Sequence, residues 1–460
     1  MCTKPLSVNK RMNQPQFANI PRVAVVGGGA AGLMCACLAA ENGADVTLFE
    51  KNRSERTLDS ERYFDNAYLG KKLLITGKGR CNVTNACTAE EFTASVISNP
   101  KFLYAAFRAF PPEKVMAYFE NLGVPLKTER GGRVFPVSDK ALDVLRALKA
   151  ELKRRGVHVI NRKIEKMEKT DSTETTKQKK NSFLLTDECG ETHLFDRAVV
   201  CTGGLSYPQT GSTGDGFAFA EHFGHTVTDF LPSLVPLECE EQALCSGLSG
   251  LSLKNVTLSV VDTERKKTVY SKMGEMLFTH FGISGPLVLS ASAHMRPFAA
   301  GKYRADIDLK PALDPAQIDA RLVSLFETGH AKNLSNLLGE MLPKSMTEPF
   351  CRMCGLSPDT KPGALNKSDR RRLAENFKRF SLHITAMRPM AEAIVTSGGV
   401  NVKQINPSTM ESKLTDGLYF AGEVMDVDAY TGGFNLQIAF STAYLAAKNA
   451  AQPILSEEEI

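Results

Sequence analysis

The amino-acid sequence predicts an α/β protein, and three observations carry this prediction. An apolar run that ends in glycine is followed by helical spacing of apolar residues and by a second apolar run, all within about 30 residues, the size of a βαβ unit. Short strand patterns return near the middle and near the end of the chain. The length of 460 residues exceeds the roughly 150 residues of one domain, so more than one structural unit is expected.

The first βαβ unit is the clearest local pattern. Val23–Val26 indicates a buried strand that ends in the glycine turn 27–29. A helical pattern follows, with Gly43 as its expected C-cap. The second strand, Val46–Phe49, stops at Glu50.

The glycine turn has the spacing Gly27-x-Gly29-x-x-Gly32, which is weak alone and much stronger between a strand and a helix. Gly27 permits the tight turn, Gly29 lets a pyrophosphate approach the backbone, and Gly32 lets the helix pack closely. The helix N-terminus offers unpaired N–H groups to the phosphates. Glu50 can accept both ribose hydroxyls of an adenosine, so the sequence predicts a Rossmann-like dinucleotide site.

The remaining elements are expected from apolar patterning. A helix is predicted over residues 141–155, and strands are predicted at 157–160, 183–186, 198–200, 256–261 and 303–309. The polar run 168–180 is predicted to be an exposed loop without function. Residues 315–380 are helical and basic in pattern.

Composition and charge exclude several classes of protein. Hydrophobic residues make up 43% and charged residues 23% of the chain, which is typical of a globular protein and not of a disordered or coiled-coil chain. The 56 Lys and Arg against 51 Asp and Glu leave a net charge of only +5. Because this margin is thin for the size of the chain, we expect neither a nucleic-acid nor a membrane partner.

Signals for export and membrane insertion are missing from the sequence. The N-terminus is polar and lacks the apolar core of a signal peptide, and no stretch reaches roughly 18 uninterrupted apolar residues. The eleven cysteines are odd in number and widely spread, which predicts reduced thiols. We therefore predict a cytoplasmic protein.

Two later segments identify the dinucleotide. Residues 196–204 form a strand that ends in Thr-Gly-Gly, and residues 415–423 form a strand that ends in glycine and an acid. Both resemble the second and third signatures of two-dinucleotide-binding-domain flavoproteins, in which the acid reaches the ribityl chain of FAD. Asp426 or Asp428 could share that role. The resemblance assigns these residues to non-covalently bound FAD: Thr202, Gly203, Gly422 and Glu423.

Four blocks in order make the resemblance specific to one family. They are residues 71–85, 204–216, 277–286 and 422–437. These blocks resemble those of a bacterial FAD protein family whose members are described as aminoacetone oxidase-type FAD-binding enzymes or as 3-dehydro-bile acid delta(4,6)-reductases. The resemblance runs from about Pro21 to Ala447, nearly the whole chain.

The resemblance implies positions along the cofactor for further residues. Ala30 and Ala31 would hold the pyrophosphate with the glycines, Lys51 would join Glu50 at the ribose, and the backbone of Ile164 would meet adenine. Three residues would lie along the cofactor: Gly79, Arg80 and Asn82. Four would open a helix at the pyrimidine side of the isoalloxazine, where a helix dipole stabilises negative charge: Gly433, Phe434, Asn435 and Leu436.

Signatures at both ends of the chain predict a discontinuous FAD domain. It would comprise residues 21–228 and 385–460, after a disordered extension over residues 1–20. Residues 229–384 would form an inserted β-rich, barrel-like and helical substrate or cap domain.

Thr202–Gly204 with residues 212–216 also resembles the fumarate reductase and 3-ketosteroid dehydrogenase group. That resemblance implies hydride transfer through flavin N5 to a carbon–carbon double bond conjugated to a carbonyl, in a small 3-dehydro-bile acid or steroid-enone substrate. NAD(P)H would be the transient electron donor. The candidate catalytic residues are His280, Arg388 and Tyr430.

Other chemistries stay open at the level of sequence. One is an FAD-dependent amine oxidase that uses oxygen, and another is a flavoprotein that binds RNA or a partner through the basic run Lys367–Arg379. Cys81-x5-Cys87 has one residue too many for a flavin disulfide reductase. Cys351-x-x-Cys354 has no second ligand pair, so no metal site is predicted.

Overall fold

A five-stranded parallel sheet joins segments from both ends of the chain, in the computed structural model that describes residues 20–52, 68–171 and 181–454. Its strand order is β19-β10-β1-β2-β6. The strands are β1 (Arg22–Val26), β2 (Asp45–Phe49), β6 (His158–Ile160), β10 (Arg197–Val200) and β19 (Leu418–Phe420), and every pair is parallel. Because β19 pairs with β10, the last part of the chain completes the sheet that the first part begins.

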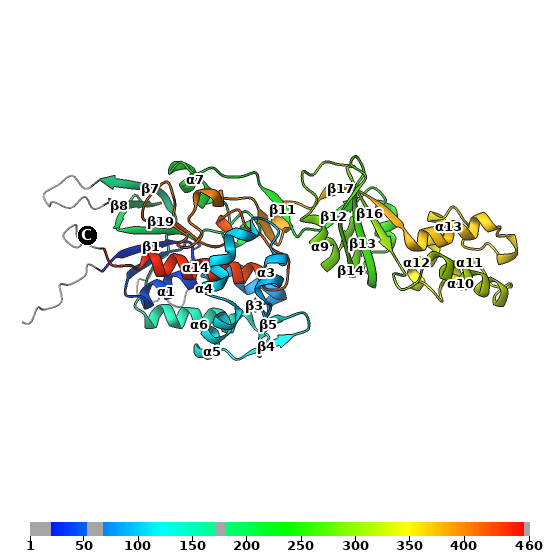
Figure 1. Ribbon diagram of the computed structural model, residues 1–460, viewed down its shortest axis with the longest axis horizontal. Helices are drawn as coiled ribbons and strands as arrows, with labels where there is room; N and C mark the ends of the chain where they lie inside the picture. Colours follow the sequence, from blue (N-terminus) through cyan, green and yellow to red (C-terminus); the bar gives the residue numbers. More distant parts are fainter. Residues whose placement is uncertain (1–19, 53–67, 172–180, 455–460) are drawn as a thin grey trace, which may run out of the picture.

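Two helices with almost no exposed side pack together against this sheet. They are α1 (Ala30–Glu41) and α14 (Phe434–Ala450), each buried along most of its length. Apolar residues around the whole circumference of a helix are expected where it is enclosed by other elements. Figure 1 shows α14, in red, beside α1, in blue. The remaining helices of this part are α2 (Lys71–Ile75), α3 (Ala89–Ser95), α4 (Tyr104–Ala109), α5 (Pro112–Asn121), α6 (Ala141–Arg154) and α7 (Asp215–His222).

Three small sheets surround the parallel one. They comprise β3 (Thr84–Asn85), β5 (Arg133–Pro136) and β4 (Leu126–Glu129); β7 (Ile164–Asp171), β8 (Asn181–Asp187) and β9 (Thr192–Phe195); and β11 (Leu231–Ser233) with β18 (Val395–Ser397). The second of these brings β7 to the edge where the parallel strands end. The last one joins the two chain crossings between the parallel sheet and the rest of the molecule.

A closed six-stranded barrel occupies the middle of the elongated molecule (Figure 1). Its antiparallel strands are β12 (Leu237–Cys239), β15 (Gly282–Ser284), β14 (Lys267–Thr279), β13 (Ser252–Asp262), β16 (Tyr303–Asp308) and β17 (Phe380–Met387). Alternating burial along β13 and β16 places one face of each strand in the barrel core, as expected of a closed sheet. Two helices, α8 (Gln242–Gly247) and α9 (Pro286–Ser292), pack on the barrel.

Four helices form the distal tip of the molecule, on the far side of the barrel from the parallel sheet (Figure 1). They are α10 (Pro315–Thr328), α11 (Leu334–Leu338), α12 (Lys344–Met353) and α13 (Lys367–Lys378). Capping boxes fix the starts of α10 and α13, at Asp314 and Asn366. The barrel and the tip share one apolar core that is separate from the core around the parallel sheet.

The predicted fold class is confirmed: an α/β part of Rossmann type carries a β-barrel with helices. The topology supports our proposed division into a discontinuous FAD domain (residues 21–228 and 385–460) and an insertion (229–384), because all six barrel strands lie between β10 and β19 in the sequence. The barrel strand β17 extends past the proposed boundary, to Met387. Most of the predicted N-terminal extension and of the polar run 168–180 lies outside the described residues. Among the described helices, none is long and apolar enough to cross a membrane.

Candidate cofactor site

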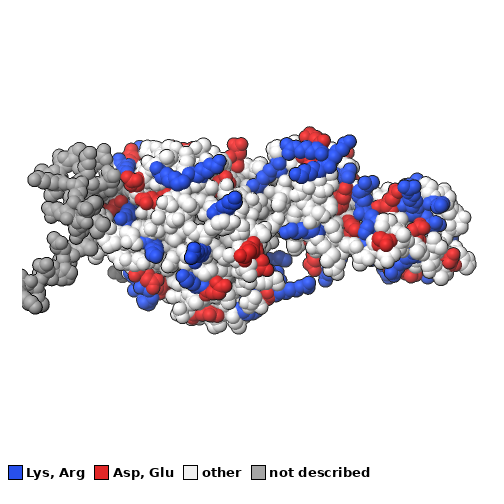
Figure 2. Space-filling view, in the orientation of Figure 1, with Lys and Arg blue, Asp and Glu red and all other residues white. Residues whose placement is uncertain are grey.

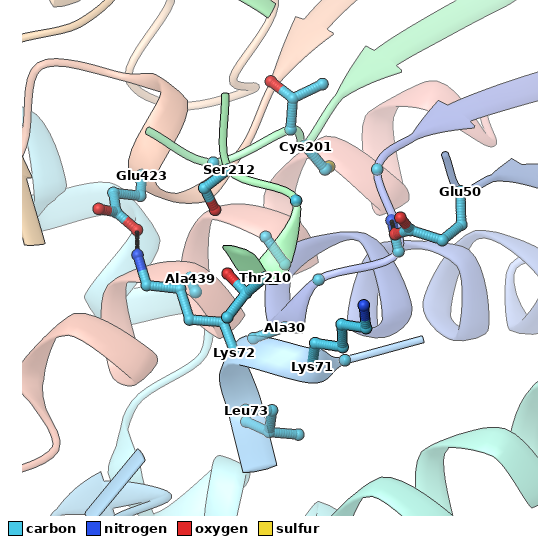
Figure 3. A pocket seen from close by; sticks show the side chains of 18 of the residues that line it. Ala30, Glu50, Lys71, Lys72, Leu73, Cys201, Thr210, Ser212, Glu423 and Ala439 are labelled. Carbon is cyan, nitrogen blue, oxygen red and sulfur yellow. Dashed lines mark hydrogen bonds and ion pairs between the residues drawn. The ribbon is translucent and has the colours of Figure 1, made fainter. Parts of the chain in front are cut away.

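A cavity extends from the glycine turn after β1 to the first turn of α14 (Figure 3). It is lined by the carboxyl ends of β1, β2 and β10, by α1 and α2, and by the start of β7. Ligands of open parallel sheets bind at the carboxyl ends of the strands, where the strand order reverses. In this sheet the strand order reverses between β1 and β10, and the cavity lies at their carboxyl ends.

The glycines of the turn meet the steric demands expected from the sequence. Gly27 has a φ of +107°, and a Cβ there would lie 2.6 Å from the Cys201 carbonyl oxygen. A Cβ on Gly32 would lie 1.8 Å from the Gly27 carbonyl oxygen, so only glycine lets α1 approach the turn. A Cβ on Gly29 would meet nothing within 4 Å. Gly29 therefore faces the open part of the cavity, where a pyrophosphate needs room.

Helices α1 and α14 both present uncapped N-termini at this cavity. Gly29 and Gly433 are their N-cap residues, and neither helix start has a side-chain cap. The first N–H groups of a helix have no partner within the helix and carry the positive end of its dipole. Residues of both first turns line the cavity: Ala30, Ala31, Asn435 and Leu436. Two helix starts thus offer donors to negative charge at separate places along one cavity.

Glu50 lies at the end of β2 and is 7% exposed. One carboxylate oxygen accepts from the Gly28 backbone N–H at 2.9 Å, and the other accepts from the backbone and side-chain N–H groups of Asn52 at 2.8 and 2.7 Å. Burial raises the pKa of Glu50, while these hydrogen bonds oppose the rise. The carboxylate is thereby held against the glycine turn, the position expected of an acid that binds ribose.

Glu423 anchors the other end of the cavity through an ion pair with Lys72. The Lys72 Nζ donates to Glu423 at 2.7 Å, the ion pair drawn in Figure 3. It also donates to the Ser206 hydroxyl at 2.6 Å. The second oxygen of Glu423 accepts from Ser206 Oγ at 2.8 Å and from the Thr396 N–H at 2.9 Å. Glu423 therefore ties together the segments after β10 and β19 and the crossing strand β18.

Two buried polar atoms near the cavity have no hydrogen-bond partner among the described residues: Thr202 Oγ1 and Asn82 Oδ1. Thr202 lines the cavity, and Asn82 Oδ1 lies 3.0 Å from where a Cβ on Gly433 would be. Thr202 Oγ1 lies against α7, 2.1 Å from where a Cβ on Gly216 would be, so neither atom faces the open cavity. The open Gly29, the two helix starts and the acid at the end of β2 are the features that fit FAD.

The structure brings most of the sequence-predicted cofactor residues to the cavity. Those that line it are Gly27, Gly29, Ala30, Ala31, Glu50, Lys51, Ile164, Thr202, Gly203, Glu423, Asn435 and Leu436. Others lie behind the lining: Gly32 packs on the turn, a Cβ on Gly422 would lie 2.8 Å from the Ala31 methyl, and Gly433 closely approaches Thr84. Gly79 and Phe434 are also not among the lining residues.

Arg80 differs most from the expected placement. Its guanidinium forms ion pairs with Glu129 and Asp139 and lies over the Phe135 ring, 4.0 Å from the centroid. These partners belong to the β4–β5 hairpin and the turn after it, and Arg80 is not among the residues that line the cavity. Its side chain therefore joins that hairpin to the segment after α2.

Several residues that line the cavity carried no individual prediction. They are Asn52, Lys71, Lys72, Arg162, Ser212 and Asp215. Lys51 also forms an ion pair with Asp215. Lys71, Lys72, Ser212 and Asp215 lie in blocks that carried the family resemblance, which is the one signal that could have found them.

The three catalytic candidates separate into two places, and none of them lines the cavity. His280 is exposed in the β14–β15 turn, and its ring contacts Phe281. The Arg388 guanidinium covers the same Phe281 ring at 4.6 Å and is paired with Glu238 and Glu392. Tyr430 lies elsewhere, between the start of α14 and the barrel.

Cys81 and Cys87 give no sign of the redox pair of a flavin disulfide reductase. Cys81 and Cys87 are free thiols, and burial raises the pKa of Cys81 to about 12 and that of Cys87 to about 11. A reactive thiol needs the opposite shift.

Asp187, Glu191 and His193 come close enough for a metal, but the Arg162 guanidinium already pairs with both carboxylates.

The parallel sheet, the glycine turn and the cavity with its acid and two helix starts define an FAD-binding flavoprotein of Rossmann type. The chain belongs to the HI0933-like protein Rossmann domain family, whose model matches residues 21–449. It is thus a flavin-dependent oxidoreductase.

Curated relatives cover nearly the whole chain. The 3-dehydro-bile acid delta(4,6)-reductase of Clostridium scindens is 28% identical over 435 residues, 94% of this chain and 99% of that protein. The ribosomal RNA dihydrouridine synthase of Haemophilus influenzae is 30% identical over 426 residues, 92% of this chain and 96% of that protein. A crystal structure of 3-ketosteroid delta1-dehydrogenase from Sterolibacterium denitrificans aligns at 15% identity and a TM-score of 0.44, over 94% of this chain and 99% of that one.

The position of Glu50 gives a testable expectation for cofactor binding. Glu50→Gln should weaken FAD binding about tenfold or more, because hydrogen bonds to charged groups contribute about 1.5–3 kcal/mol. Burial raises the pKa of Glu50, so this carboxylate becomes protonated at a higher pH than an exposed glutamate does. As the solution is acidified, the wild type should therefore begin to lose FAD above the pH at which exposed glutamates are protonated. FAD dissociation constants measured across pH check both effects.

The matched control for this experiment is Glu90→Gln, because Glu90 is exposed in the first turn of α3. That variant should bind FAD like the wild type and keep the acid-dependent loss. The Glu50→Gln variant should show no titration from this group. Equal FAD affinity of the Glu50→Gln variant and the wild type would remove Glu50 from the ribose.

Proposed function

We propose that this protein reduces a carbon–carbon double bond conjugated to a carbonyl group, with NAD(P)H as electron donor and a 3-dehydro-bile acid or steroid enone as acceptor. Bound FAD would supply a hydride through N5 to the carbon at the far end of the conjugated system. The protein must then hold the cofactor, polarise or orient the carbonyl, and deliver a proton to the adjacent carbon.

One observation carries this proposal: Tyr430 packs against residues that line the cavity at the end where α14 begins. Tyr430 packs in an apolar cluster with Ile394 and Val395, and both of those residues line the cavity. Burial raises the pKa of Tyr430, which keeps the phenol protonated at neutral pH. A protonated phenol would serve as the proton donor for an acceptor bound at this end of the cavity.

The names of the relatives agree with this chemistry. A delta(4,6)-reductase of a 3-dehydro-bile acid and a dihydrouridine synthase both saturate a carbon–carbon bond next to a carbonyl system. In uracil that bond is C5=C6, which is conjugated to the C4 carbonyl. The same arrangement of cofactor and proton donor would serve either acceptor.

Uracil in RNA is the second candidate acceptor, and the distal tip favours it. Residues 315–379 hold eleven Lys or Arg against seven Asp or Glu, a net charge of +4 out of +5 for the whole chain. The tip lies beyond the barrel from the parallel sheet that carries the cavity, so it cannot touch a small acceptor bound there (Figure 1). Figure 2 shows Lys and Arg side chains on the tip with Asp and Glu among them. The predicted absence of a nucleic-acid partner stays a prediction, and salt-dependent binding of an RNA transcript would test it.

The basic run of α13 by itself supports RNA binding less than its sequence suggests. Arg370 pairs with Asp319, Arg371 with Glu375, and Arg372 with Asp369. Other exposed basic residues of the tip are spread over its helices and loops: Arg321, Lys332, Lys344, Lys361 and Arg379. Reversal of several of these charges should weaken RNA binding if the tip contacts phosphates.

Anaerobic mixing with NADH and with NADPH tests the electron donor. The flavin absorbance of the FAD-loaded protein should bleach with at least one of the two, because a reductase must be reduced by its donor before it meets its acceptor. Absence of bleaching with both, together with bleaching by an amine such as aminoacetone, would replace this proposal by the alternative of an amine oxidase. Product formation that requires oxygen would confirm that replacement.

A further inference from the structure

From the geometry we infer that His294 of the insertion is a positioning residue for Tyr430, an inference that rests on the proposed function. The His294 Nε2 and the Tyr430 hydroxyl lie 2.6 Å apart. The two residues are separated by 136 positions in the sequence and come from different parts of the fold. His294 follows α9 on the barrel side, and Tyr430 precedes α14 on the cofactor side.

The backbone of Tyr430 is fixed to the start of α14. The side chain of Asn435, which lines the cavity, donates to the carbonyls of Ala429 and Tyr430 at 2.8 and 3.2 Å and accepts from the Ala429 N–H at 3.0 Å. The Tyr430 N–H donates to the Ser95 carbonyl at 3.0 Å. The backbone of Tyr430 is therefore held at a set place relative to the cavity, and the phenol can move only by rotation of the side chain.

The barrel supplies the partners that limit this rotation. His294 contacts the hydroxyl, and the Lys272 ammonium from β14 lies 4.5 Å from the centre of the Tyr430 ring. His294 is itself packed against Tyr270, with ring centroids 5.5 Å apart. Burial and the positive charges of Arg296 and Lys272 lower the pKa of His294, so its imidazole is neutral at pH 7.

A neutral imidazole with its proton on Nε2 can donate a hydrogen bond to the phenol oxygen. The phenol O–H is then free to point toward the acceptor. During the reaction, the Tyr430 O–H bond breaks and its proton goes to the acceptor carbon next to the carbonyl, while the hydride forms the other new C–H bond. The negative charge left on the phenol oxygen is stabilised by the His294 N–H and by Lys272, and a proton from water restores the phenol.

The test measures the oxidation of dithionite-reduced, FAD-loaded protein by an acceptor under anaerobic conditions. The acceptors are a 3-oxo bile acid with double bonds at positions 4 and 6 and an unmodified ribosomal RNA transcript. Tyr430→Phe should slow this step about 100-fold or more and His294→Ala about tenfold, while His294→Gln, which keeps an N–H donor, should recover part of the loss. FAD content and reduction by NAD(P)H should not change in any of the three.

The pH dependence of that step separates positioning from mere packing. The charged and titratable groups that face His294 are Tyr270, Lys272, Arg296, Asp428 and Tyr430. The wild-type rate should rise as the pH is lowered through the depressed pKa of His294, because the imidazolium donates the same hydrogen bond and adds positive charge beside the developing phenolate. His294→Ala should lack this inflection. An ultraviolet titration should also show that the pKa of Tyr430 rises further in His294→Ala, a readout that needs no acceptor.

Each outcome has a defined meaning. His222→Ala, an exposed histidine at the end of α7, is the matched control and should behave like the wild type. If the wild type reacts with an acceptor and His294→Ala keeps both its rate and its pH profile, this inference is overturned alone. If neither acceptor oxidises the wild type, the proposed function fails, and an unshifted Tyr430 pKa in His294→Ala would then overturn the coupling as well.

Discussion

Gly32→Ala should abolish FAD binding and destabilise the protein by about 3 kcal/mol or more. The added Cβ would lie 1.8 Å from the Gly27 carbonyl oxygen and 3.3 Å from the Cys201 Cβ, so α1 must move away from the turn. That movement displaces the uncapped helix start from the place where a pyrophosphate would lie. Urea denaturation and the flavin content of purified protein measure the two effects.

Gly29→Ala is the matched control for Gly32→Ala. Its Cβ would meet no protein atom within 4 Å, and its φ of −79° suits any residue. The variant should therefore be as stable as the wild type without cofactor, yet bind FAD more weakly because the methyl group enters the space left for the phosphates. If Gly29→Ala retained full FAD affinity, the pyrophosphate would not lie at this turn.

Asp428→Ala should lower the free energy of unfolding by about 3 kcal/mol. Asp428 is fully buried, accepts from Ser233 Oγ at 2.7 Å, and pairs with Arg296 at 3.1 Å. Arg296 comes from the insertion and also donates to Ser98, so this ion pair ties the insertion to the cofactor-binding part. Removal of the carboxylate leaves the buried Ser233 hydroxyl without its acceptor and the half-buried Arg296 guanidinium with Ser98 as its remaining partner, and it empties a fully buried position.

A double-mutant cycle with Arg296→Met isolates the ion pair. If the pair contributes as described, Asp428→Ala and Arg296→Met together should cost less than the sum of the two single changes. Thermal or urea denaturation of the four proteins supplies the values. Simple additivity would contradict a direct contribution of the pair and leave only loss of packing.

Local patterns allowed the cofactor-binding end of the site to be predicted. Gly27, Gly29, Gly32 and Glu50 act within one βαβ unit, where spacing alone decides which residue meets the turn. The parts of the cavity made by β10 and by α14 were also predicted, because each carries its own short signature. The backbone of those segments requires glycine at particular positions, and these glycines can be recognised in the sequence.

Contacts over long sequence separations could not be predicted. Lys72 and Glu423 are 351 positions apart, and His294 and Tyr430 are 136 apart. A single lysine or histidine has no spacing partner that would reveal such a pair. Arg80 lies inside a family block and was therefore expected along the cofactor. Its partners are instead Glu129 and Asp139, at the neighbouring β4–β5 hairpin, and nothing in the block indicated them. Closure of the barrel likewise depends on pairing between distant strands, such as β12 with β17.

The most direct test of the proposed reaction follows the anaerobic oxidation of reduced, FAD-loaded protein and the mass of the acceptor together. The account predicts that flavin absorbance returns without oxygen and that one acceptor, the dienone bile acid or a uridine of the RNA transcript, gains two hydrogen atoms per flavin. The contrary result is flavin that stays reduced with both acceptors until oxygen is admitted, which would contradict the proposed reduction of these acceptors.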